Sequence, residues 1–258
     1  MDPLDFSGRT VLVTGGGRGV GRGITERFLA AGAEVWICGR RALDTLPEAG
    51  GRTARFAAAD VREPEQVQRL VGTIVRESGR LDVLINNAGG SPATAAATAS
   101  PRFSERIVQL NLLAPLHCSQ AANAVMQAQP EGGAIVNVAS VSAVRPSPGT
   151  AVYGAAKAGL LSLTRSLAVE WAPRVRVNAV TAGMIRTEQS ELHYGDADAV
   201  RRVEATVPLG RLGEPREVGD VCLFLASPLA SYVSGASVLL HGGGEPPAFL
   251  AAVKGDAG

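Results

Sequence analysis

Seven short runs of apolar and β-branched residues alternate along this chain with longer stretches of helix-type sequence. The strand-type runs cover residues 10–14, 34–38, 54–59, 83–86, 134–139, 175–180 and 237–240. The helix-type stretches cover residues 20–31, 64–78, 103–129, 153–171 and 215–226. A strand, a helix and a second strand in succession form a right-handed unit with parallel strands, and helices then cover both faces of the sheet. We therefore predict an α/β fold with a parallel sheet between two layers of helices.

With 258 residues, of which 46% are hydrophobic and 19% charged, the chain is long enough to bury one large core. No internal repeat or linker divides it, so we expect one domain over residues 1–258. Residues 90–100 indicate a surface loop, and residues 185–208 indicate a long polar loop that we take as a candidate substrate loop. Residues 245–258 are expected to form a loosely packed tail.

Charge and cysteine content argue against several classes of function. The net charge is +1, with 25 basic and 24 acidic residues interspersed, so no basic stripe indicates binding to nucleic acid. No run approaches the ~20 apolar residues of a membrane span, and the first residues lack the apolar core of a signal peptide. Cys38, Cys118 and Cys222 are odd in number, widely spaced and without histidines at ligand spacing. We therefore expect no disulfide framework, no metal site and a cytoplasmic protein.

A glycine-rich segment follows the first predicted strand and opens the first predicted helix. It contains Gly15, Gly19 and Gly21, with three residues in the first gap. Glycine permits a tight turn and lets backbone N–H groups approach a phosphate at the positive end of a helix. A glycine cluster alone is a weak signal, but the strand before it and the helix after it supply the context of a dinucleotide site.

The end of the second predicted strand bears on which dinucleotide binds. A carboxylate about 20 residues after the glycine turn would bind the ribose 2′-hydroxyl of NAD, but this strand ends in Arg40 and Arg41. Either arginine can pair with a 2′-phosphate, and Arg18 in the glycine turn can add a second contact. These residues favour NADP(H). The alternative is that they are solvated surface arginines, in which case NAD(H) is the cofactor.

Only two of the 25 basic residues are lysines, and one of them, Lys157, lies four positions after Tyr153. On a helix, this spacing puts both side chains on one face with Cβ atoms about 5–6 Å apart. An ammonium is a compact charge with a tunable pKa, and its proximity would lower the pKa of the Tyr153 phenol. A Tyr and a Lys at this spacing also occur by chance as an exposed helical pair, so the pair takes its meaning from its context.

The sequence resembles the classical short-chain dehydrogenase/reductase family from about residue 8 to residue 243. The motifs, in the usual order, are the glycine turn, Asn86-Asn87-Ala88-Gly89 after the fourth run, Ser140 after the fifth, and Tyr153 with Lys157 at the start of the next helix. The resemblance implies a Rossmann-type, doubly wound sheet of seven parallel strands. It also implies that Asn111, Ser140, Tyr153 and Lys157 are the catalytic residues.

In that family, a hydride goes to the carbon of a ketone while the tyrosine, here Tyr153, gives a proton to its oxygen. Moving a phenol from a pKa near 10 to about 7 needs ~4 kcal/mol of preferential stabilisation of the phenolate, which Lys157 and the oxidised nicotinamide would supply. Lys157 would also bind the nicotinamide ribose, Ser140 would hold the substrate oxygen, and Asn111 would hold a water of a proton relay.

The resemblance also implies contacts with the cofactor. The positions concerned, together with the glycines of the turn, Tyr153 and Lys157, are Arg18, Val20, Asp60, Val61, Asn87, Ala88, Gly89, Gly183, Ile185 and Thr187. Asp60 and Val61 would border the adenine. Ala182 stands where the family usually has a proline before Gly183, which frees the backbone that proline would fix. His241 stands where an acid or amide is more usual, and we expect a structural or interfacial role for it.

We therefore predict an NADP(H)-dependent oxidoreductase that interconverts a small-molecule ketone and a secondary alcohol. Residues 207–215 and 224–227 most resemble the 3-oxoacyl-thioester reductases. The alternatives are an NAD-dependent secondary alcohol, sugar or steroid dehydrogenase, and a nucleotide-binding regulatory protein on the same fold, against which the intact catalytic set argues. The family resemblance implies a homotetramer or a homodimer built through helices 103–129 and 153–171.

Overall fold

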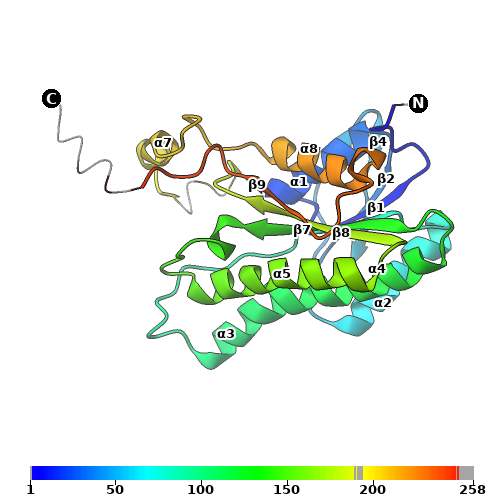
Figure 1. The fold of residues 1–258 in the computed structure, drawn as a ribbon, viewed down its shortest axis with the longest axis horizontal. Helices are drawn as coiled ribbons and strands as arrows, with labels where there is room; N and C mark the ends of the chain where they lie inside the picture. Colours follow the sequence, from blue (N-terminus) through cyan, green and yellow to red (C-terminus); the bar gives the residue numbers. More distant parts are fainter. Residues whose placement is uncertain (1, 189, 191–193, 248, 250–258) are drawn as a thin grey trace.

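A sheet of seven strands runs through the centre of the computed structural model, which describes residues 2–188, 190, 194–247 and 249 (Figure 1). In spatial order, the strands are β5, β2, β1, β6, β7, β8 and β9, and each neighbouring pair is parallel. Their bounds are Thr10–Thr14 for β1, Glu34–Gly39 for β2, Arg55–Ala58 for β5, Val83–Asn86 for β6, Gly133–Ser140 for β7, Val175–Ala182 for β8 and Ser237–Leu240 for β9. The predicted seven-stranded parallel sheet is confirmed.

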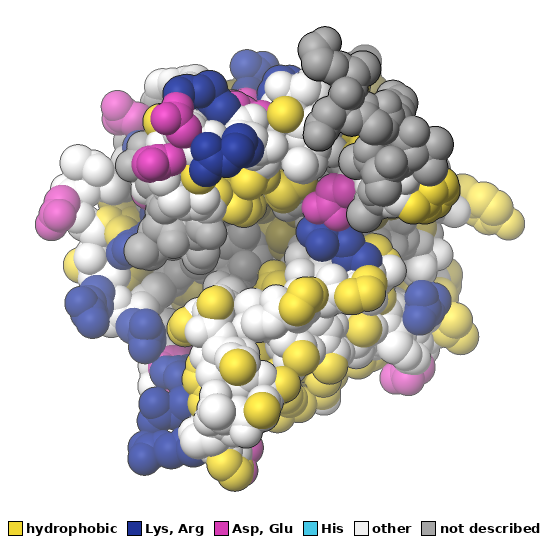
Figure 2. Space-filling model, turned by 90° about the vertical axis from the view of Figure 1, so that its left-hand side faces the viewer, with side chains coloured by type: hydrophobic (Ala, Val, Ile, Leu, Met, Phe, Trp, Pro, Cys, Tyr) yellow, Lys and Arg dark blue, Asp and Glu magenta, His cyan; other side chains and the backbone are white. Residues whose placement is uncertain are grey.

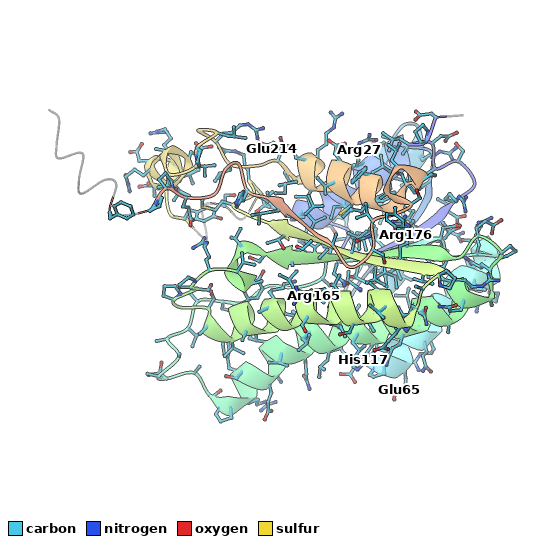
Figure 3. All side chains as sticks on the ribbon, in the orientation of Figure 1. Arg27, Glu65, His117, Arg165, Arg176 and Glu214 are labelled. Carbon is cyan, nitrogen blue, oxygen red and sulfur yellow. The ribbon has the colours of Figure 1, made fainter. Side chains whose placement is uncertain are left out.

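Helices cover both faces of this sheet, which confirms the predicted three layers. Figure 1 shows α1 and α8 on one face, and α2, α4 and α5 on the other. Figure 3 shows the side chains in the same orientation, with Arg27 of α1 and Arg165 of α5 on opposite faces of the sheet. The helices are α1 Gly19–Ala30, α2 Pro64–Ser78, α3 Pro101–Val108, α4 Ala114–Ala128, α5 Ala151–Glu170, α7 Ala197–Ala205 and α8 Pro215–Ala226. In the part of the chain that the structure describes, none of them has both the length and the apolar character that crossing a membrane requires.

Strand β1 lies between two apolar cores and contributes to both. All of its residues are buried. Val11 and Val13 join a cluster that contains Ile24 and Phe28 of α1, whereas Leu12 joins a second cluster formed with α2 and α4. Because successive side chains of a strand point to opposite faces, one buried run serves both layers of the fold.

The strand order reverses beside β1. The chain first extends the sheet from β1 through β2 to β5 and then continues on the other side of β1 with β6. Open α/β sheets bind ligands at the carboxyl ends of their strands, at the point of such a reversal. The loops that follow β1 and β6 meet at this point.

The predicted helical stretch over residues 103–129 is confirmed, since helical residues run without a gap from 101 to 128, but its centre is not α-helical. A π-helical segment, Gln109–Leu113, separates α3 from α4, and the amide of Ala114 donates to the carbonyl of Gln109, five residues earlier. Pro115 accounts for the interruption, since it has no amide to continue the α-helical ladder and its ring crowds the carbonyl four residues before it.

The prediction that residues 185–208 form an irregular loop is wrong in part, because α7 lies within it. The Asp196 side chain caps this helix by accepting a hydrogen bond from the amide of Ala199 at 2.9 Å. An aspartate before an amphipathic stretch is a helix-start signal that the loop prediction overlooks. Residues 189 and 191–193 of this loop, and residues 248 and 250–258 of the predicted tail, lie outside the described residues.

A small antiparallel hairpin is a further element that the sequence analysis misses. Its strands are β3, Glu48–Ala49, and β4, Arg52–Thr53. Gly50 and Gly51 join them with φ angles of +58° and +71°. Two successive glycines in the left-handed region form the tight turn that suits a two-residue hairpin.

The substitution Phe28→Ala tests how much the core beneath α1 contributes to stability. Phe28 is fully buried, and its ring meets that of Phe6 edge to face with centroids 5.3 Å apart. We expect Phe28→Ala to lower the free energy of unfolding by about 3–5 kcal/mol, because it removes buried apolar surface and leaves a cavity. Urea unfolding followed by circular dichroism measures the loss. Phe249→Ala, at a phenylalanine that is 65% exposed, is the control and should change stability by less than about 0.5 kcal/mol.

Candidate active site

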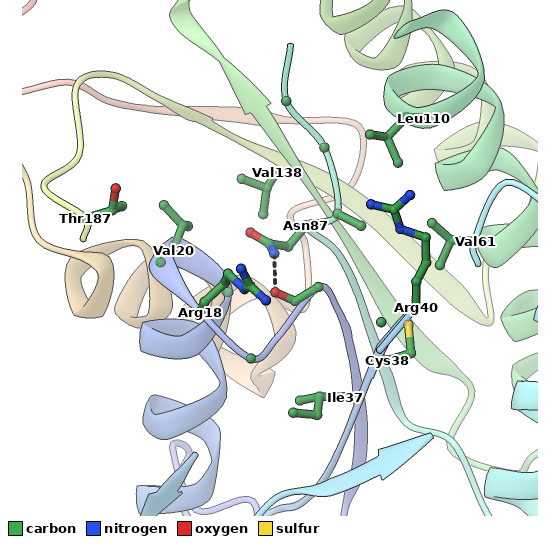
Figure 4. A pocket seen from close by; sticks show the side chains of 18 of the residues that line it. Arg18, Val20, Ile37, Cys38, Arg40, Val61, Asn87, Leu110, Val138 and Thr187 are labelled. Carbon is green, nitrogen blue, oxygen red and sulfur yellow. Dashed lines mark hydrogen bonds between the residues drawn. The ribbon is translucent and has the colours of Figure 1, made fainter. Parts of the chain in front are cut away.

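A cleft of about 850 Å³ opens at the carboxyl ends of the central strands. Figure 2 shows the face of the molecule at this edge of the sheet, which is hollowed at its centre, and Figure 4 shows the cleft from close by. Every residue that the sequence analysis proposes for cofactor binding lines it. They are Gly15, Arg18, Gly19, Val20, Gly21, Arg40, Arg41, Asp60, Val61, Asn87, Ala88, Gly89, Tyr153, Lys157, Gly183, Ile185 and Thr187. Ser140 also lines the cleft, and Asn111 is buried next to lining residue Gly90.

The turn between β1 and α1 is too tight for side chains at several of its positions. Gly15 has a φ angle of +64°. A Cβ atom on Gly21 would lie 2.2 Å from the carbonyl oxygen of Gly15, so a side chain there would push α1 away from the turn. The N-cap residue, Arg18, gives no side-chain cap to the helix that begins at Gly19. The positive end of α1 therefore opens on the cleft and can hold a phosphate group.

A buried threonine, which the sequence analysis does not single out, fastens the end of β6 to this turn. The Oγ1 atom of Thr14 accepts hydrogen bonds from the amides of Asn87 and Ala88, both at 3.0 Å. The Nδ2 atom of Asn87 donates to the carbonyl oxygens of Thr14 at 2.9 Å and Gly15 at 3.3 Å. Figure 4 shows the Asn87 side chain reaching across to the turn. Asn87 is thus a fixed part of the cleft wall.

Arginines gather at the end of the cleft beside β2. Arg18, Arg40 and Arg41 are exposed and line it from the glycine turn and from the end of β2. Figure 4 shows Arg18 and Arg40 on two sides of the opening. Guanidinium groups so placed can hold an anion between them.

Arg62 is a further lining residue that the sequence analysis misses. Its Nε and Nη2 atoms donate to the two carboxylate oxygens of Asp60, at 2.9 and 2.5 Å. These hydrogen bonds, with a smaller contribution from the charge of Arg40, hold the pKa of Asp60 below its ordinary value despite partial burial. The signal in the sequence is a basic residue two positions after the predicted adenine-binding acid.

Ser140 and Tyr153 meet at the other end of the cleft. Ser140 is the last residue of β7, Tyr153 lies in the first turn of α5, and both side chains line the cleft. Burial raises the pKa of the Tyr153 phenol, and the nearby hydroxyl of Ser140 lowers it by less. The expectation that Lys157 depresses this pKa is therefore not met, because the loss of hydration outweighs the other influences.

Lys157 is buried, with 3% of its surface exposed. Its Nζ atom donates to the carbonyl oxygen of Val138 at 2.7 Å and lies 5.8 Å from the centroid of the Tyr153 ring. Burial lowers the pKa of Lys157 from 10.5 to about 8. A charged ammonium in this position costs stability, which is typical of a group retained for function.

Gly89 is the point at which Asn111 approaches Lys157. A Cβ atom on Gly89 would lie 2.7 Å from Oδ1 of Asn111 and 3.3 Å from Nζ of Lys157. Hydrogen bonds with the amide and carbonyl of Gly90 and with the carbonyl of Ile107 fix the Asn111 side chain. The π-helical segment and a glycine at the end of β6 thus bring the amide and the amine together.

The strand end at Gly183 packs tightly on β9. A Cβ atom on Gly183 would lie 2.7 Å from the Cβ atom of His241, so the histidine packs behind the cleft wall. Ile185 then forms a bridge with Gly213. Within the described ranges, no group of three or more His, Cys, Asp or Glu side chains is arranged to hold a metal ion.

The sequence matches, over residues 15–245, the family model described as enoyl-(acyl carrier protein) reductase. An L-rhamnose 1-dehydrogenase (NAD(P)(+)) of Azotobacter vinelandii is 38% identical over 91% of this chain and 96% of its own. A 3-oxoacyl-[acyl-carrier-protein] reductase of Chlamydia pneumoniae is 35% identical over 93% of this chain and 98% of its own. The crystal structure of a short-chain type dehydrogenase/reductase from Mycobacterium marinum, 32% identical, covers 95% of this chain and 99% of its own with a TM-score of 0.86.

Replacing Lys157 with Met tests whether the burial of its charge lowers the stability of the protein. At pH 7 we expect the free energy of unfolding of the variant to be about 1–3 kcal/mol higher than that of the wild type, because burial destabilises the charged lysine in the folded protein. Between pH 8 and 10.5 the unfolded lysine still binds a proton that the folded one has lost, so the wild type gains stability over that range. The difference should therefore shrink toward pH 10. Thermal unfolding at pH 7 and pH 10 measures it.

Arg69→Met is the control, since Arg69 is an exposed cation on α2, outside the cleft and away from α5. It should change stability by less than about 0.5 kcal/mol at both pH values. A lower stability of Lys157→Met than of the wild type at pH 7 would show that the buried ammonium is a net stabilising group.

Proposed function

This chain belongs to the classical short-chain dehydrogenase/reductase family, and we propose that it is an NADP(H)-dependent enzyme that interconverts a ketone and a secondary alcohol. Membership makes it an oxidoreductase of CH–OH or C=O groups with an NAD(P)(H) cofactor. The observation that supports the proposal most is the cleft itself, which has Ser140, Tyr153 and Lys157 at one end and exposed arginines at the other.

A nicotinamide bound in the cleft would supply a hydride for the carbonyl carbon, and the protein must supply a proton for the oxygen. We assign the proton to the phenol of Tyr153 and the positioning of the oxygen to the Ser140 hydroxyl. Their shared place on the cleft wall and the influence of Ser140 on the pKa of the Tyr153 phenol support this assignment. One carbonyl oxygen between them can contact both hydroxyl groups.

Lys157 stabilises the phenolate that Tyr153 becomes when it gives up its proton. The shift of a phenol from a pKa near 10 to about 7 requires ~4 kcal/mol, and burial alone acts in the opposite direction. An ammonium acts most strongly in a site that excludes water, and Lys157 is in such a site. The closeness of Asn111 to Nζ around Gly89 supports a proton relay through these two residues.

The arginines support NADP(H) as the cofactor. Arg40 and Arg41, with Arg18 across the opening, would hold a 2′-phosphate, and the Arg62–Asp60 pair would border the adenine. The open N-terminus of α1 would hold the pyrophosphate. Residues 87–89 and the lining residues after β8 would enclose the nicotinamide and its ribose.

A 3-oxoacyl thioester is the substrate class that we propose first. It rests on the resemblance of residues 207–215 and 224–227 and on the name of the Chlamydia pneumoniae relative. The second candidate is an NAD-dependent sugar, steroid or secondary alcohol dehydrogenase, which the relative named for L-rhamnose and NAD(P)(+) favours. The arginines beside β2 favour the first over the second.

We further propose a cytoplasmic homotetramer or homodimer built through α4 and α5. Ala155, Ala158 and Ser162 lie on the exposed side of α5, and such small side chains let a second helix approach closely. All three cysteines are buried and free, which supports a reducing compartment.

Tyr153→Phe tests the assignment of the proton donor. The ring still fills its place but has no proton to give, so we expect kcat with a reducible ketone to fall by about 10²–10⁴-fold. The dissociation constant of NADPH, measured by nicotinamide fluorescence, should stay within about twofold of the wild type. Tyr232→Phe, at a fully exposed tyrosine, is the control and should leave both unchanged. Unchanged turnover in Tyr153→Phe would refute the assignment.

Arg40→Asp tests the cofactor. The wild type should bind NADPH more tightly than NADH, and the variant should lose most of that preference because a carboxylate repels the 2′-phosphate and accepts from the 2′-hydroxyl. Titration of nicotinamide fluorescence gives all four dissociation constants. Arg69→Asp is the matched control, because it makes the same charge change at an exposed side chain of α2 that lies outside the cleft. If the wild type prefers NADH, we would conclude that Arg40 is a surface residue without a role in cofactor binding, and alcohol oxidation would become the activity to screen first.

A further inference from the structure

Four buried polar side chains are joined by hydrogen bonds in the layer between the sheet and helices α4 and α5. The Nδ2 atom of Asn137 donates to Oγ1 of Thr164 at 2.9 Å, and Oδ1 of Asn137 accepts from Nδ2 of Asn86 at 2.8 Å. Asn86 donates further to Oγ of Ser119 at 2.9 Å and to the carbonyl of Pro115 at 3.3 Å. No more than 2% of any of the four residues is exposed. We call the side chains of residues 86, 119, 137 and 164 the buried polar network.

The hydrogen bond between Asn137 and Thr164 joins the two elements that carry the hydroxyl groups of the proposed site. Asn137 lies on β7, three residues before Ser140. Thr164 lies on α5, the helix that begins with the turn of Tyr153. A slip of α5 along β7 would therefore break this hydrogen bond and change the distance between the two hydroxyl groups.

A second contact from the same face of α5 reaches the neighbouring residue of β7. Lys157 precedes Thr164 by seven positions, which is about two helical turns, and both are buried against the sheet. The Nζ atom of Lys157 donates to the carbonyl oxygen of Val138, which follows Asn137. The helix is thus held to β7 at two points, and one of them is the ammonium of the proposed site.

Asn86 extends the network to the elements on the other side of β7. It lies on β6, directly opposite Asn137 in the parallel register, and its partners Ser119 and Pro115 belong to α4. Helix α4 follows the π-helical segment that carries Asn111. No residue of the network lines the cleft, so the network acts on the site only through the elements that it joins.

Hydrogen bonds fix a register that apolar contacts define less sharply. The cluster around the network consists largely of Leu, Ile, Val and Ala side chains, and their attraction has no preferred direction. A buried amide or hydroxyl that loses its partner, in contrast, pays its full desolvation, so displaced arrangements are disfavoured. Alignment to this precision matters for catalysis, because a displacement of about 1 Å can lower a rate about 100-fold.

We propose that Asn137 and Thr164 are positioning residues for the reaction. Their hydrogen bond sets the register of α5 against β7, and thereby the distance between the hydroxyl groups of Ser140 and Tyr153. The inference rests on the proposed function, since it takes Tyr153 as the proton donor. Neither positioning residue lines the cleft, so each acts on the reaction through the element that carries it.

Lysine NMR measures the register without any substrate, because the chain has only two lysines. In protein labelled with ¹³C at the lysine Cε, the Lys157→Met variant identifies the Lys157 signal, and titration of that signal gives a midpoint near the pKa of about 8. Thr164→Val keeps the shape of the side chain but has no hydroxyl, so α5 loses its register and water reaches the ammonium. The midpoint should then rise by about half a pH unit or more.

Turnover with NADPH and a reducible ketone is the second measurement. In Thr164→Val, kcat should fall by about tenfold or more while KM for the ketone changes by less than about threefold, because misalignment acts on the chemical step. Thr164→Ser keeps the hydroxyl and should restore the midpoint and kcat nearly to the wild-type values. Thr164→Cys keeps only a weak acceptor and should change both in the same direction by less, so it carries the test if Thr164→Val does not fold.

Ser227→Ala is the control for a loss of stability alone. The Ser227 hydroxyl is buried and donates to the carbonyl of Phe224 at the end of α8, on the opposite face of the sheet from α5 (Figure 1). This variant should be less stable than the wild type but keep its titration midpoint and kcat. If either measurement stays at the wild-type value in both Thr164→Val and Thr164→Cys, the proposal is wrong and the network only stabilises the fold.

Failure of this proposal and failure of the proposed function give different results. If the wild type reduces no ketone, the proposed reaction is wrong, and the lysine titration alone decides whether the hydrogen bond sets the register. If the wild type reduces ketones and the Thr164 variants keep its midpoint and kcat, only the positioning role is wrong.

Discussion

The close contact between the glycine turn after β1 and the end of β6 is the constraint on which the rest of the site depends. Gly21 packs against the carbonyl of Gly15, and Asn87 donates two hydrogen bonds to Thr14 across the two neighbouring strands. These contacts leave no room for side chains and hold two strand ends at a fixed separation. The cleft, the open end of α1 and the wall that carries Gly89 all follow from that separation.

The catalytic end depends on a different balance, between burial and charge. Lys157 is placed where its ammonium is poorly hydrated, and Tyr153 is placed where its phenolate is disfavoured. Each group alone is unfavourable in its charged form, but a phenolate and an ammonium together satisfy one another in a region of low dielectric constant. In the reaction that we propose, ketone reduction leaves this pair of charges behind, and Asn111 packs close to Lys157 around Gly89.

The sequence carried different amounts of information about different parts. The seven strands were predictable because buried parallel strands are short, apolar and bounded by helices. Helix α7 and the β3–β4 hairpin also had local signals, an aspartate cap for the helix and two successive glycines for the hairpin. These signals were missed because the residues around them form weaker patterns. Pro115 indicated a break in the long helix, but not that the break would be a π-helical segment carrying Asn111. Arg62 had a local signal, because its partner Asp60 lies two positions before it, whereas the partners of Thr14 lie 73 and 74 positions away along the chain and no local pattern predicts them.

The order of strands and helices, the glycine turn and the Tyr153–Lys157 spacing were determined by the sequence alone, because they depend on local periodicity and on residue types whose chemistry is distinctive. Only the tertiary structure decided the direction of the pKa shifts of Tyr153 and Lys157, since hydration depends on every segment packed around a group. It also decided that Arg145 and Glu245 form an ion pair. Segments so far apart along the chain come together only because the parallel sheet places the carboxyl ends of its strands at one edge. No local sequence pattern predicts such a contact.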